Sequence, residues 1–246
     1  MAAPLSRPVQ VRVSGDWACF TRPEMKVERV SYQYMTPSAA RGALEAICWH
    51  PQFRWVITQI EVLKPVRYQS VTRNEVQKKI PAGNIAGWMR DPESMKPFYA
   101  DSRAATKDGG SGLNATQRST LALRDVAYNI TAHALVDGED LRADDTPEKY
   151  ASMFERRVER GQCFSRPYLG CREFAADFTT IDPAEQSVSD TMDLGLMLYD
   201  IIFAGDAKKG GNEAVFFQAR IERGVMVTDP LIVLPDEGQR ERVLSC

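Results

Sequence analysis

The chain has little of what metal-binding, secreted or membrane proteins usually show. It carries only two histidines, and none of its five cysteines forms a C-x-x-C pair, so no zinc site is predicted. No apolar run is long enough to span a bilayer, and no charged segment followed by an apolar run marks a secretory signal. The odd, scattered set of cysteines indicates reduced thiols, and we expect a cytoplasmic protein without membrane contact.

Sequence motifs of several hydrolase classes are also missing. The chain contains no G-x-S-x-G nucleophile motif, no phosphate-binding P-loop and no acidic cluster typical of two-metal nucleases. Serine hydrolase, nucleoside triphosphatase and two-metal nuclease activities therefore have no support in the sequence. Neither a metal ion nor a cofactor is expected.

Charge is distributed unevenly along the 246 residues, although the formal net charge is only −2. Residues 50–127 hold twelve Lys and Arg against seven Asp and Glu, whereas residues 173–246 hold six against fourteen. The first region suits contact with phosphates and the second does not. Taken alone, the difference is better explained by ordinary fluctuation of charge along a chain.

The first third of the chain shows a strand pattern, a helix pattern and a second strand pattern. Apolar residues alternate from Val9 onward, which predicts a short strand. Thr36 followed by proline is typical of a helix start, and apolar residues at helical spacing come next. Residues 53–66 resemble a long strand whose apolar phase shifts near Gln59, so we expect a bulge or bend there.

The middle of the chain adds an irregular segment, a strand, a helix and a last strand. Residues 73–119 lose periodicity and gain Gly, Pro, Lys and Arg, which indicates a basic insertion. Residues 121–136 alternate with period two and predict a strand. A second helix begins after Thr146, again followed by proline, and ends at Gly161. Residues 171–179 supply the last strand.

This order of elements predicts an α+β fold. Strand, helix, strand, strand, helix, strand is the split β-α-β-β-α-β plan of ferredoxin-like domains, which RNA-recognition (RRM-like) modules also use. We therefore expect a ferredoxin-like N-terminal domain over residues 1–185, interrupted by the basic insertion at about 73–119. Gly-rich turns between apolar strands then predict an antiparallel β-meander over residues 186–246, ending in a polar tail.

Five arginines gather in RRVERGQCFSRPYLGCREF, residues 156–174, here called the arginine segment. Two glycines let the backbone approach a ligand closely, and aromatic side chains beside them can stack on bases. Lys149, Arg156 and Arg160 also share one face of the predicted second helix. For any single arginine, a solvated helix face or a pair with the acidic tail is the better explanation. Five together favour phosphate contact.

Few residues suit catalysis on their own. His50 lies just after a helix end and two positions from Cys48, whereas His133 falls within a strand. A lone histidine in a strand is usually structural, and we interpret His133 in that way. Cys48, taken by itself, is typical of a small buried hydrophobic residue.

Long stretches of the sequence resemble a known family. GDWACFTRPEMKVERVSYQYMTPSAARGALEAICWHP, WVITQIEVLKPVRY and GQCFSRPYLGCREF are similar to the CRISPR-associated subtype I-C protein of the fifth Cas family, in the RAMP superfamily. The resemblance covers most of the chain. It implies a ferredoxin-like N-terminal domain with a β-rich C-terminal part. It also implies metal-free cleavage of CRISPR precursor RNA within each repeat, and retention on the 5′ handle inside a surveillance complex with other subunits.

The family pattern implies a set of catalytic residues. The family assigns catalysis to a tyrosine in an IYWKP motif and to a Lys-His pair at the start of the second helix. This chain reads ICWHP, so Cys48 replaces the tyrosine and His50 the motif lysine. Lys149 matches the family lysine, and Tyr150 replaces the histidine. We expect a rearranged site in which Lys149 stabilises the phosphorane, His50 transfers protons and Tyr150 positions the 2′-hydroxyl or acts as a weak acid. A buried core tyrosine is an equal alternative for Tyr150.

The same resemblance gives the arginine segment a ligand. We expect RNA to contact Arg156, Arg157, Arg160, Arg166, Tyr168 and Arg172, with Cys163 and Cys171 packed beneath the backbone. Arg22 and Lys26 either contact RNA or only order a loop. Two further interpretations stay open. The chain could be a non-catalytic subunit that binds the RNA handle, or it could bind double-stranded DNA without sequence preference through residues 73–119.

Overall fold

The computed structural model describes residues 5–76, 82–95, 115–137, 141–203 and 212–245. The chain divides into two compact units, one formed by residues 1–69 with 121–246 and the other by residues 70–120. Much of the expected basic insertion, residues 77–81 and 96–114, lies outside the described residues.

The described chain alternates strands and helices. The strands are β1 (Val9–Ala18), β2 (Arg29–Val30), β3 (Phe53–Val62), β4 (Tyr68–Val76), β5 (Ala115–Val136), β6 (Asp177–Thr179), β7 (Met192–Ile202), β8 (Glu213–Ile221) and β9 (Val225–Val227). The helices are α1 (Pro37–Ile47), α2 (Ala82–Arg90), α3 (Pro147–Glu159), α4 (Pro230–Val233) and α5 (Glu237–Ser245), with two 3-10 turns, η1 (Pro23–Met25) and η2 (Pro92–Ser94). None of these helices is long and apolar enough to cross a membrane.

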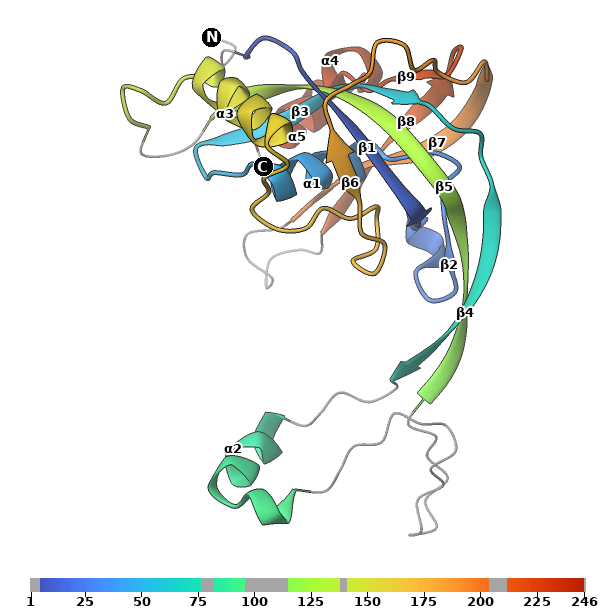
Figure 1. The fold of residues 1–246 in the computed structure, drawn as a ribbon, viewed down its shortest axis with the longest axis vertical. Coiled ribbons are helices and arrows are strands. Elements are labelled where there is room, and N and C mark those ends of the chain that lie inside the picture. Colours follow the sequence, from blue (N-terminus) through green and yellow to red (C-terminus); the bar gives the residue numbers. More distant parts are fainter. Residues whose placement is uncertain (1–4, 77–81, 96–114, 138–140, 204–211, 246) are drawn as a thin grey trace. The chain divides into compact units, whose positions relative to one another are not determined.

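Antiparallel pairing joins most strands into one sheet in the order β6-β1-β5-β3-β9, and β2 and β4 also pair with β5. Strands β7 and β8 form a separate two-stranded sheet. Helix α1 contacts β3 and β7, α3 contacts β1 and β6, and the two helices contact each other, so they lie on one face of the sheet (Figure 1). The structure thus confirms a mixed α and β fold with antiparallel sheets.

The sequence signals at helix starts and at the bulge are confirmed. Thr36 Oγ1 accepts a hydrogen bond from Ala39 N, and Thr146 Oγ1 accepts one from Lys149 N, both at 3.3 Å. Each threonine satisfies a backbone N–H that the first helical turn leaves without a partner. The pairing of β3 with β5 shifts register between Ile57 and Gln59, where the apolar phase changes. The expected polar tail is polar, and residues Glu237–Ser245 of it form a helix, α5.

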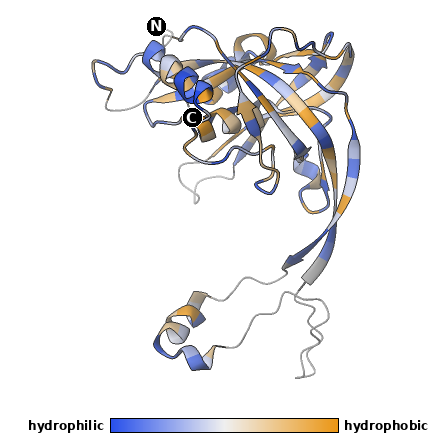
Figure 2. Cartoon of the chain, viewed as in Figure 1, coloured by the Kyte–Doolittle hydropathy of each residue, from blue (hydrophilic) through white to orange (hydrophobic). Residues whose placement is uncertain are grey.

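The core lies between the sheet and the two helices. Figure 2 shows apolar and polar residues alternating along the strands, as a sheet with one buried face requires. Val11 of β1 and Ile130 of β5 face each other in register and are fully buried. Phe154 of α3 is also fully buried and packs against Trp55 of β3, with ring centroids 4.8 Å apart. Each such side chain contributes roughly 1.5–3 kcal/mol of burial energy.

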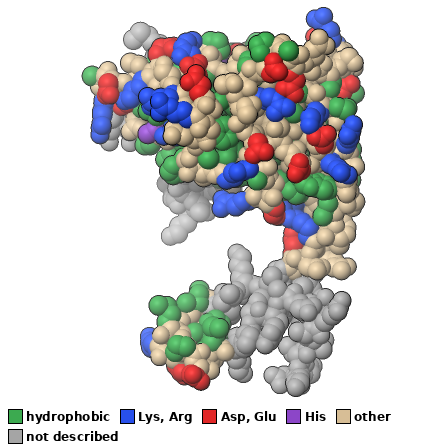
Figure 3. Space-filling view, in the orientation of Figure 1, with side chains coloured by type: hydrophobic (Ala, Val, Ile, Leu, Met, Phe, Trp, Pro, Cys, Tyr) green, Lys and Arg blue, Asp and Glu red, His purple; other side chains and the backbone are tan. Residues whose placement is uncertain are grey.

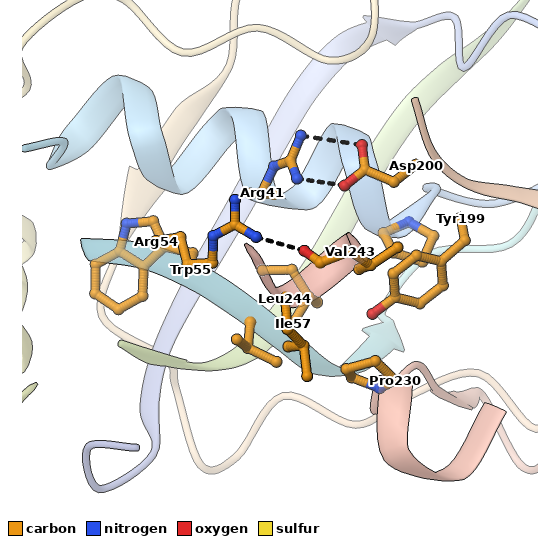
Figure 4. A pocket seen from close by; sticks show the side chains of 11 residues that line it. Arg41, Arg54, Trp55, Ile57, Tyr199, Asp200, Pro230, Val243 and Leu244 are labelled. Carbon is orange, nitrogen blue, oxygen red and sulfur yellow. Dashed lines mark hydrogen bonds and ion pairs between the residues drawn. The ribbon is translucent and has the colours of Figure 1, made fainter. Parts of the chain in front are cut away.

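Charged side chains fasten the second sheet and the C-terminal helix to this core (Figure 4). Arg41 of α1 makes two hydrogen bonds to Asp200 of β7, whose side chain is only 8% exposed. Arg54 of β3 donates a hydrogen bond of 2.5 Å to the carbonyl oxygen of Val243 in α5. A bidentate arginine and carboxylate pair fixes geometry as well as charge. These contacts therefore determine where β7 and α5 sit against α1 and β3.

Candidate active site

The first turn of α3 places Lys149 beside two carboxylates. Thr146 is the N-cap of α3, so Asp144 and Asp145 lie just before the helix begins. The side chain of Lys149 folds back over these two residues. Lys149 Nζ lies 2.9 Å from Asp144 Oδ2 and 3.0 Å from Asp145 Oδ1. The two carboxylates differ in environment, because the side chain of Asp144 is 72% exposed and that of Asp145 only 4%.

Asp145 is the centre of a hydrogen-bond network. Its Oδ1 accepts a hydrogen bond of 2.6 Å from the hydroxyl of Tyr150, and its Oδ2 accepts one of 2.9 Å from the backbone N–H of Arg142. The bond from Tyr150, followed by those from Arg142 and Lys149, holds the pKa of Asp145 well below its usual range. The carboxylate is therefore ionised at neutral pH and orients both neighbouring side chains.

The same network raises the pKa values of Lys149 and Tyr150. Hydrogen bonds to Asp144 and Asp145 raise the pKa of Lys149 to about 12. Burial, and then the hydrogen bond to Asp145, raise the pKa of Tyr150 to about 12. Tyr150 is 2% exposed and stacks on Phe53, with ring centroids 4.3 Å apart. A tyrosine in this state is a weak acid and a poor base.

His50 reaches the same place from the loop after α1. Its ring centroid lies 5.8 Å from that of Tyr150, and its Nε2 atom has no hydrogen-bond partner among the described residues. These side chains line a hollow of about 330 Å³, here called the Lys149 pocket. Its lining residues are His50, Pro51, Gln52, Arg142, Asp145, Lys149, Tyr150 and Met153. The structure thus brings together Lys149, Tyr150 and His50, whereas Cys48, which stands at the position of the family tyrosine, does not line this pocket.

Cys48 and His133 lie elsewhere. Cys48 is fully buried next to the end of α1 and does not line the Lys149 pocket; burial raises the pKa of its thiol. Its carbonyl oxygen accepts a hydrogen bond of 2.9 Å from the indole N–H of Trp55. His133 Nδ1 lies 2.7 Å from the carbonyl oxygen of Ser6, which is consistent with the structural interpretation of this histidine.

The arginine segment divides into paired and unpaired cations. Arg157 donates a hydrogen bond of 2.8 Å to the carbonyl oxygen of Ile47 at the end of α1, and Arg166 lies 2.7 Å from Asp177 Oδ1. The other three arginines are exposed and form no ion pair among the described residues: Arg156, Arg160 and Arg172. Lys and Arg side chains gather over α3 in Figure 3.

Aromatic side chains and glycine backbone accompany these cations. Tyr168 is 38% exposed, with the guanidinium of Arg172 at 6.0 Å from its ring centroid, and Phe164 is 75% exposed. Gly170 has a φ of +80°, and a Cβ there would lie 2.1 Å from the carbonyl oxygen of Cys19. Only glycine permits this approach, so the backbone of the segment is fixed against the end of β1.

The expectation that Cys163 and Cys171 both pack beneath the backbone of the arginine segment is wrong for Cys163. Cys171 is buried beside Cys19, but Cys163 is exposed. Gly161 ends α3 in a left-handed conformation, and the chain after it runs over the surface, so the side chain of Cys163 has nothing to pack beneath.

Arg22 and Lys26 flank η1. The guanidinium of Arg22 lies 4.5 Å above the ring of Tyr32 and 3.7 Å from a carboxylate oxygen of Glu24, whereas Lys26 is exposed. These contacts of Arg22 favour the loop-ordering interpretation. Among the residues that the structure describes, no group of three His, Cys, Asp or Glu side chains could hold a metal ion.

Sequence patterns alone had missed Asp144, Asp145 and Arg142. Their only signal is position, because two aspartates stand directly before a Thr-Pro helix start. Acidic residues at a helix N-terminus are common for electrostatic reasons alone, so this signal does not mark a site.

Comparison with known proteins finds a family that covers almost the whole chain. The family model described as CRISPR-associated protein (Cas_Cas5) matches residues 9–237. The chain is 43% identical over 233 residues to CRISPR pre-crRNA endoribonuclease Cas5d of Mannheimia succiniciproducens, covering 92% of this chain and 96% of that protein. It is 39% identical over 230 residues to the protein of the same name from Thermus thermophilus, covering 88% and 89%.

Solved structures show the same fold at lower identity. A CRISPR-associated protein superposes with a TM-score of 0.64 at 22% identity, covering 92% of this chain and 94% of that one. The functionally uncharacterized protein SMU1763c from Streptococcus mutans gives a TM-score of 0.61 at 22% identity, covering 92% and 93%.

Proposed function

Since the chain belongs to the Cas5 family of CRISPR-associated proteins, we propose that it is an endoribonuclease that cuts CRISPR precursor RNA within the repeat. Two relatives at 39–43% identity over most of the chain carry the name CRISPR pre-crRNA endoribonuclease. The single observation that carries the proposal is the convergence of Lys149, Tyr150 and His50 on one pocket.

Cleavage without a metal ion asks three things of these side chains. The ribose 2′-hydroxyl must lose a proton, the phosphorane must be stabilised and the leaving 5′-oxygen must gain a proton. Lys149 supplies a positive charge at neutral pH, as any lysine with an ordinary pKa does, and its contacts with two carboxylates fix the position of that charge. His50 is the proton-transfer group, since an imidazole can both accept and donate a proton and its Nε2, although buried, has no hydrogen-bond partner among the described residues.

The two aspartates give Lys149 a way to exchange partners. Its pair with the exposed Asp144 is screened by water and worth little, so an incoming phosphate can take the place of that carboxylate. Its contact with the buried Asp145 persists and keeps the ammonium aimed at the pocket. Tyr150 is neutral and buried, and its hydroxyl holds Asp145 in place, so it positions Lys149 through that carboxylate rather than acting as a base. Cys48 contributes packing only.

RNA binding extends along α3 into the arginine segment. Arg156, Arg160 and Arg172 hold the RNA backbone, while Tyr168 and Phe164 offer stacking surfaces beside a close-approaching glycine backbone. Arg157 and Arg166 order the segment, and Lys26 is a further exposed candidate beside Arg22. After the cut, these contacts keep the protein on the 5′ handle within a type I-C surveillance complex that contains other subunits.

The fold suits this role. Strand order β6-β1-β5-β3, antiparallel throughout, with α1 and α3 on one face, supports a ferredoxin-like domain over residues 1–185. Residues 70–120 form a separate unit, which supports a basic insertion at about 73–119. Residues 186–246 form the C-terminal region, in which β7 and β8 pair with each other and β9 pairs with β3.

A second candidate is a subunit that binds the handle without cutting. The fully buried Cys48, in place of the family tyrosine, favours it, because this thiol cannot reach a substrate. Incubation of the protein with its labelled host repeat RNA in excess EDTA, beside RNA with a 2′-deoxyribose at the cut site, separates the two functions. A single cut that the deoxyribose abolishes supports the metal-independent nuclease. Tight binding without a cut would support the second candidate and refute the first.

A further inference from the structure

A second and larger hollow is also lined by His50. It has a volume of about 450 Å³, and its lining residues are Arg41, Glu45, Trp49, His50, Pro51, Phe53, Arg54, Asp137, Ile201 and Phe203. We call it the Trp49 pocket. It shares only His50 and Pro51 with the Lys149 pocket, so the two hollows meet at His50. None of the roles proposed above uses it.

The walls of the Trp49 pocket combine aromatic surface with hydrogen-bonding groups. Trp49 is 49% exposed although it follows directly on the buried end of α1, and Phe203 is 69% exposed at the end of β7. Pockets of about 300–1,000 Å³ with apolar walls and a few polar groups are typical of small-ligand sites. Flat aromatic surfaces suit a flat ligand, because stacking needs only a π-face.

The charges in this pocket disfavour a phosphate group. Arg41 is already paired with Asp200 and lies 3.4 Å from Glu45, and Arg54 donates to the carbonyl oxygen of Val243 (Figure 4). Glu45 and Asp137 add two carboxyl groups to the lining. A neutral, planar group with donor and acceptor edges meets these conditions, whereas an anion does not.

We infer that the Trp49 pocket holds one unpaired nucleobase of the repeat RNA, next to the phosphate that occupies the Lys149 pocket. This inference rests on the proposed function for its ligand. A phosphate on one side of His50 leaves the base of a neighbouring nucleotide within reach of the other side, where it stacks on Trp49. Trp49 is thus a base-stacking residue, and His50 separates the stacked base from the reacting phosphate.

Abasic substitutions test the inference through binding alone. The probe is host repeat RNA with a 2′-deoxyribose at the cut site, in a series that removes each unpaired base in turn. Loss of one stacked base should weaken binding to the unmodified protein roughly 5- to 150-fold. With Trp49→Ala, loss of that same base should change affinity less than twofold, because the stacking partner is already gone.

Two further variants serve as controls. Trp49→Phe keeps an aromatic face and should restore sensitivity to the missing base. Phe216→Ala removes an aromatic side chain of β8 that is 39% exposed and lines neither pocket, so the abasic series should match that of the unmodified protein. Equal losses in the unmodified protein and Trp49→Ala at every position would overturn the inference. Because the probe is not cleaved, this result is independent of whether the protein cuts RNA.

Discussion

The N-terminal end of α3 holds its cation between two carboxylates, whereas the C-terminal end presents cations with no carboxylate partner among the described residues. Lys149 is fixed by Asp144 and Asp145, while Arg156 and Arg160 are exposed. The helix dipole stabilises carboxylates at the N-terminus of α3 and cations at its C-terminus. It therefore favours the two aspartates at one end and the exposed arginines at the other. A paired cation is oriented in advance, and an unpaired one is available to phosphate.

This difference separates two requirements of an RNA-cutting protein. Catalysis needs a charge in a fixed position before the substrate arrives, because reorganisation during the reaction costs rate. Binding needs charge that can follow a flexible backbone and exchange counterions for phosphates. Substitutions at the two ends of α3 should therefore affect different measurements.

The largest expected effect is on the rate of cutting at the N-terminal end. Lys149→Ala should lower the single-turnover cleavage rate about 10²- to 10³-fold, the usual cost of losing one transition-state charge donor. Affinity for uncleavable repeat RNA should change little, because exposed arginines carry the binding. A Lys149→Ala, His50→Ala double variant that still cuts at the normal rate would refute the proposed site. Arg220→Ala, which removes an exposed cation of β8 outside the proposed site, is the control.

The next largest expected effect concerns the backbone of the arginine segment, which begins at the C-terminal end of α3. Gly161 and Gly170 both have positive φ, at +61° and +80°, but only at Gly170 would a Cβ meet backbone, 2.1 Å from the carbonyl oxygen of Cys19. Gly161→Ala should cost about 1 kcal/mol of stability from strain alone. Gly170→Ala should cost roughly 3 kcal/mol and weaken RNA binding, because the arginine segment must move away from β1. Thermal unfolding of the pair measures the difference, and equal melting temperatures would contradict this account.

The two aspartates offer a matched test within the N-terminal end. Asp145→Asn weakens the network that orients Lys149 and Tyr150, and we expect a 10- to 100-fold lower cleavage rate, as for other groups that orient a functional side chain. Asp144→Asn should leave the rate within about threefold, since its exposed pair is worth little. Similar rates for the two variants would show that burial does not distinguish these carboxylates.

Asp145 should also affect stability in acid. Hydrogen bonds lower the pKa of Asp145 below its ordinary value of 3.8, so the folded state binds this proton less readily than the unfolded state. The resulting stability is present above the ordinary pKa and is lost as the pH falls toward the lowered one. Asp145→Asn should remove this part of the acid sensitivity between pH 5 and 2, measured as melting temperature against pH. An unchanged profile would contradict the assigned pKa shift.

The sequence predicts an interaction well when its partners are close together in the chain. Thr36 and Thr146 mark their helices because a cap is formed within three residues, and the bulge near Gln59 follows from the local apolar phase. By contrast, Arg157 is satisfied by the carbonyl oxygen of Ile47, 110 positions away in the chain. Nothing near Arg157 in the sequence distinguishes it from the exposed Arg156.

The site shows the same limit. Resemblance to a family pointed to Lys149 and to the loop of His50, but it could not show that Asp145 joins Lys149 to Tyr150, because that contact depends on how the chain turns before α3. Nor could the sequence show which side chains are exposed. Cys163 and Cys171 stand in similar local sequence, and only the path of the chain after Gly161 leaves one at the surface and the other buried beside Cys19.

The smallest expected effect is the loss of unpaired charge at the C-terminal end. The triple variant Arg156→Ala, Arg160→Ala, Arg172→Ala should weaken repeat RNA binding about tenfold near physiological salt, since each exposed charge contact is worth under about 1 kcal/mol. The dependence of log affinity on log salt should become shallower by about 2, which is about 0.7 for each lost contact to single-stranded RNA. Cleavage at saturating RNA should be unchanged.

A double variant of Arg166→Ala with Arg172→Ala then separates paired from unpaired cations. Because Arg166 is held by Asp177, the double variant should lose only about as much RNA affinity as Arg172→Ala alone. A much larger loss would mean that phosphate displaces Asp177, just as it is proposed to displace Asp144 from Lys149. In that event the contrast between the two ends of α3 would lie in burial rather than in pairing, because Asp177 is 78% and Asp144 72% exposed, whereas only Asp145 is enclosed.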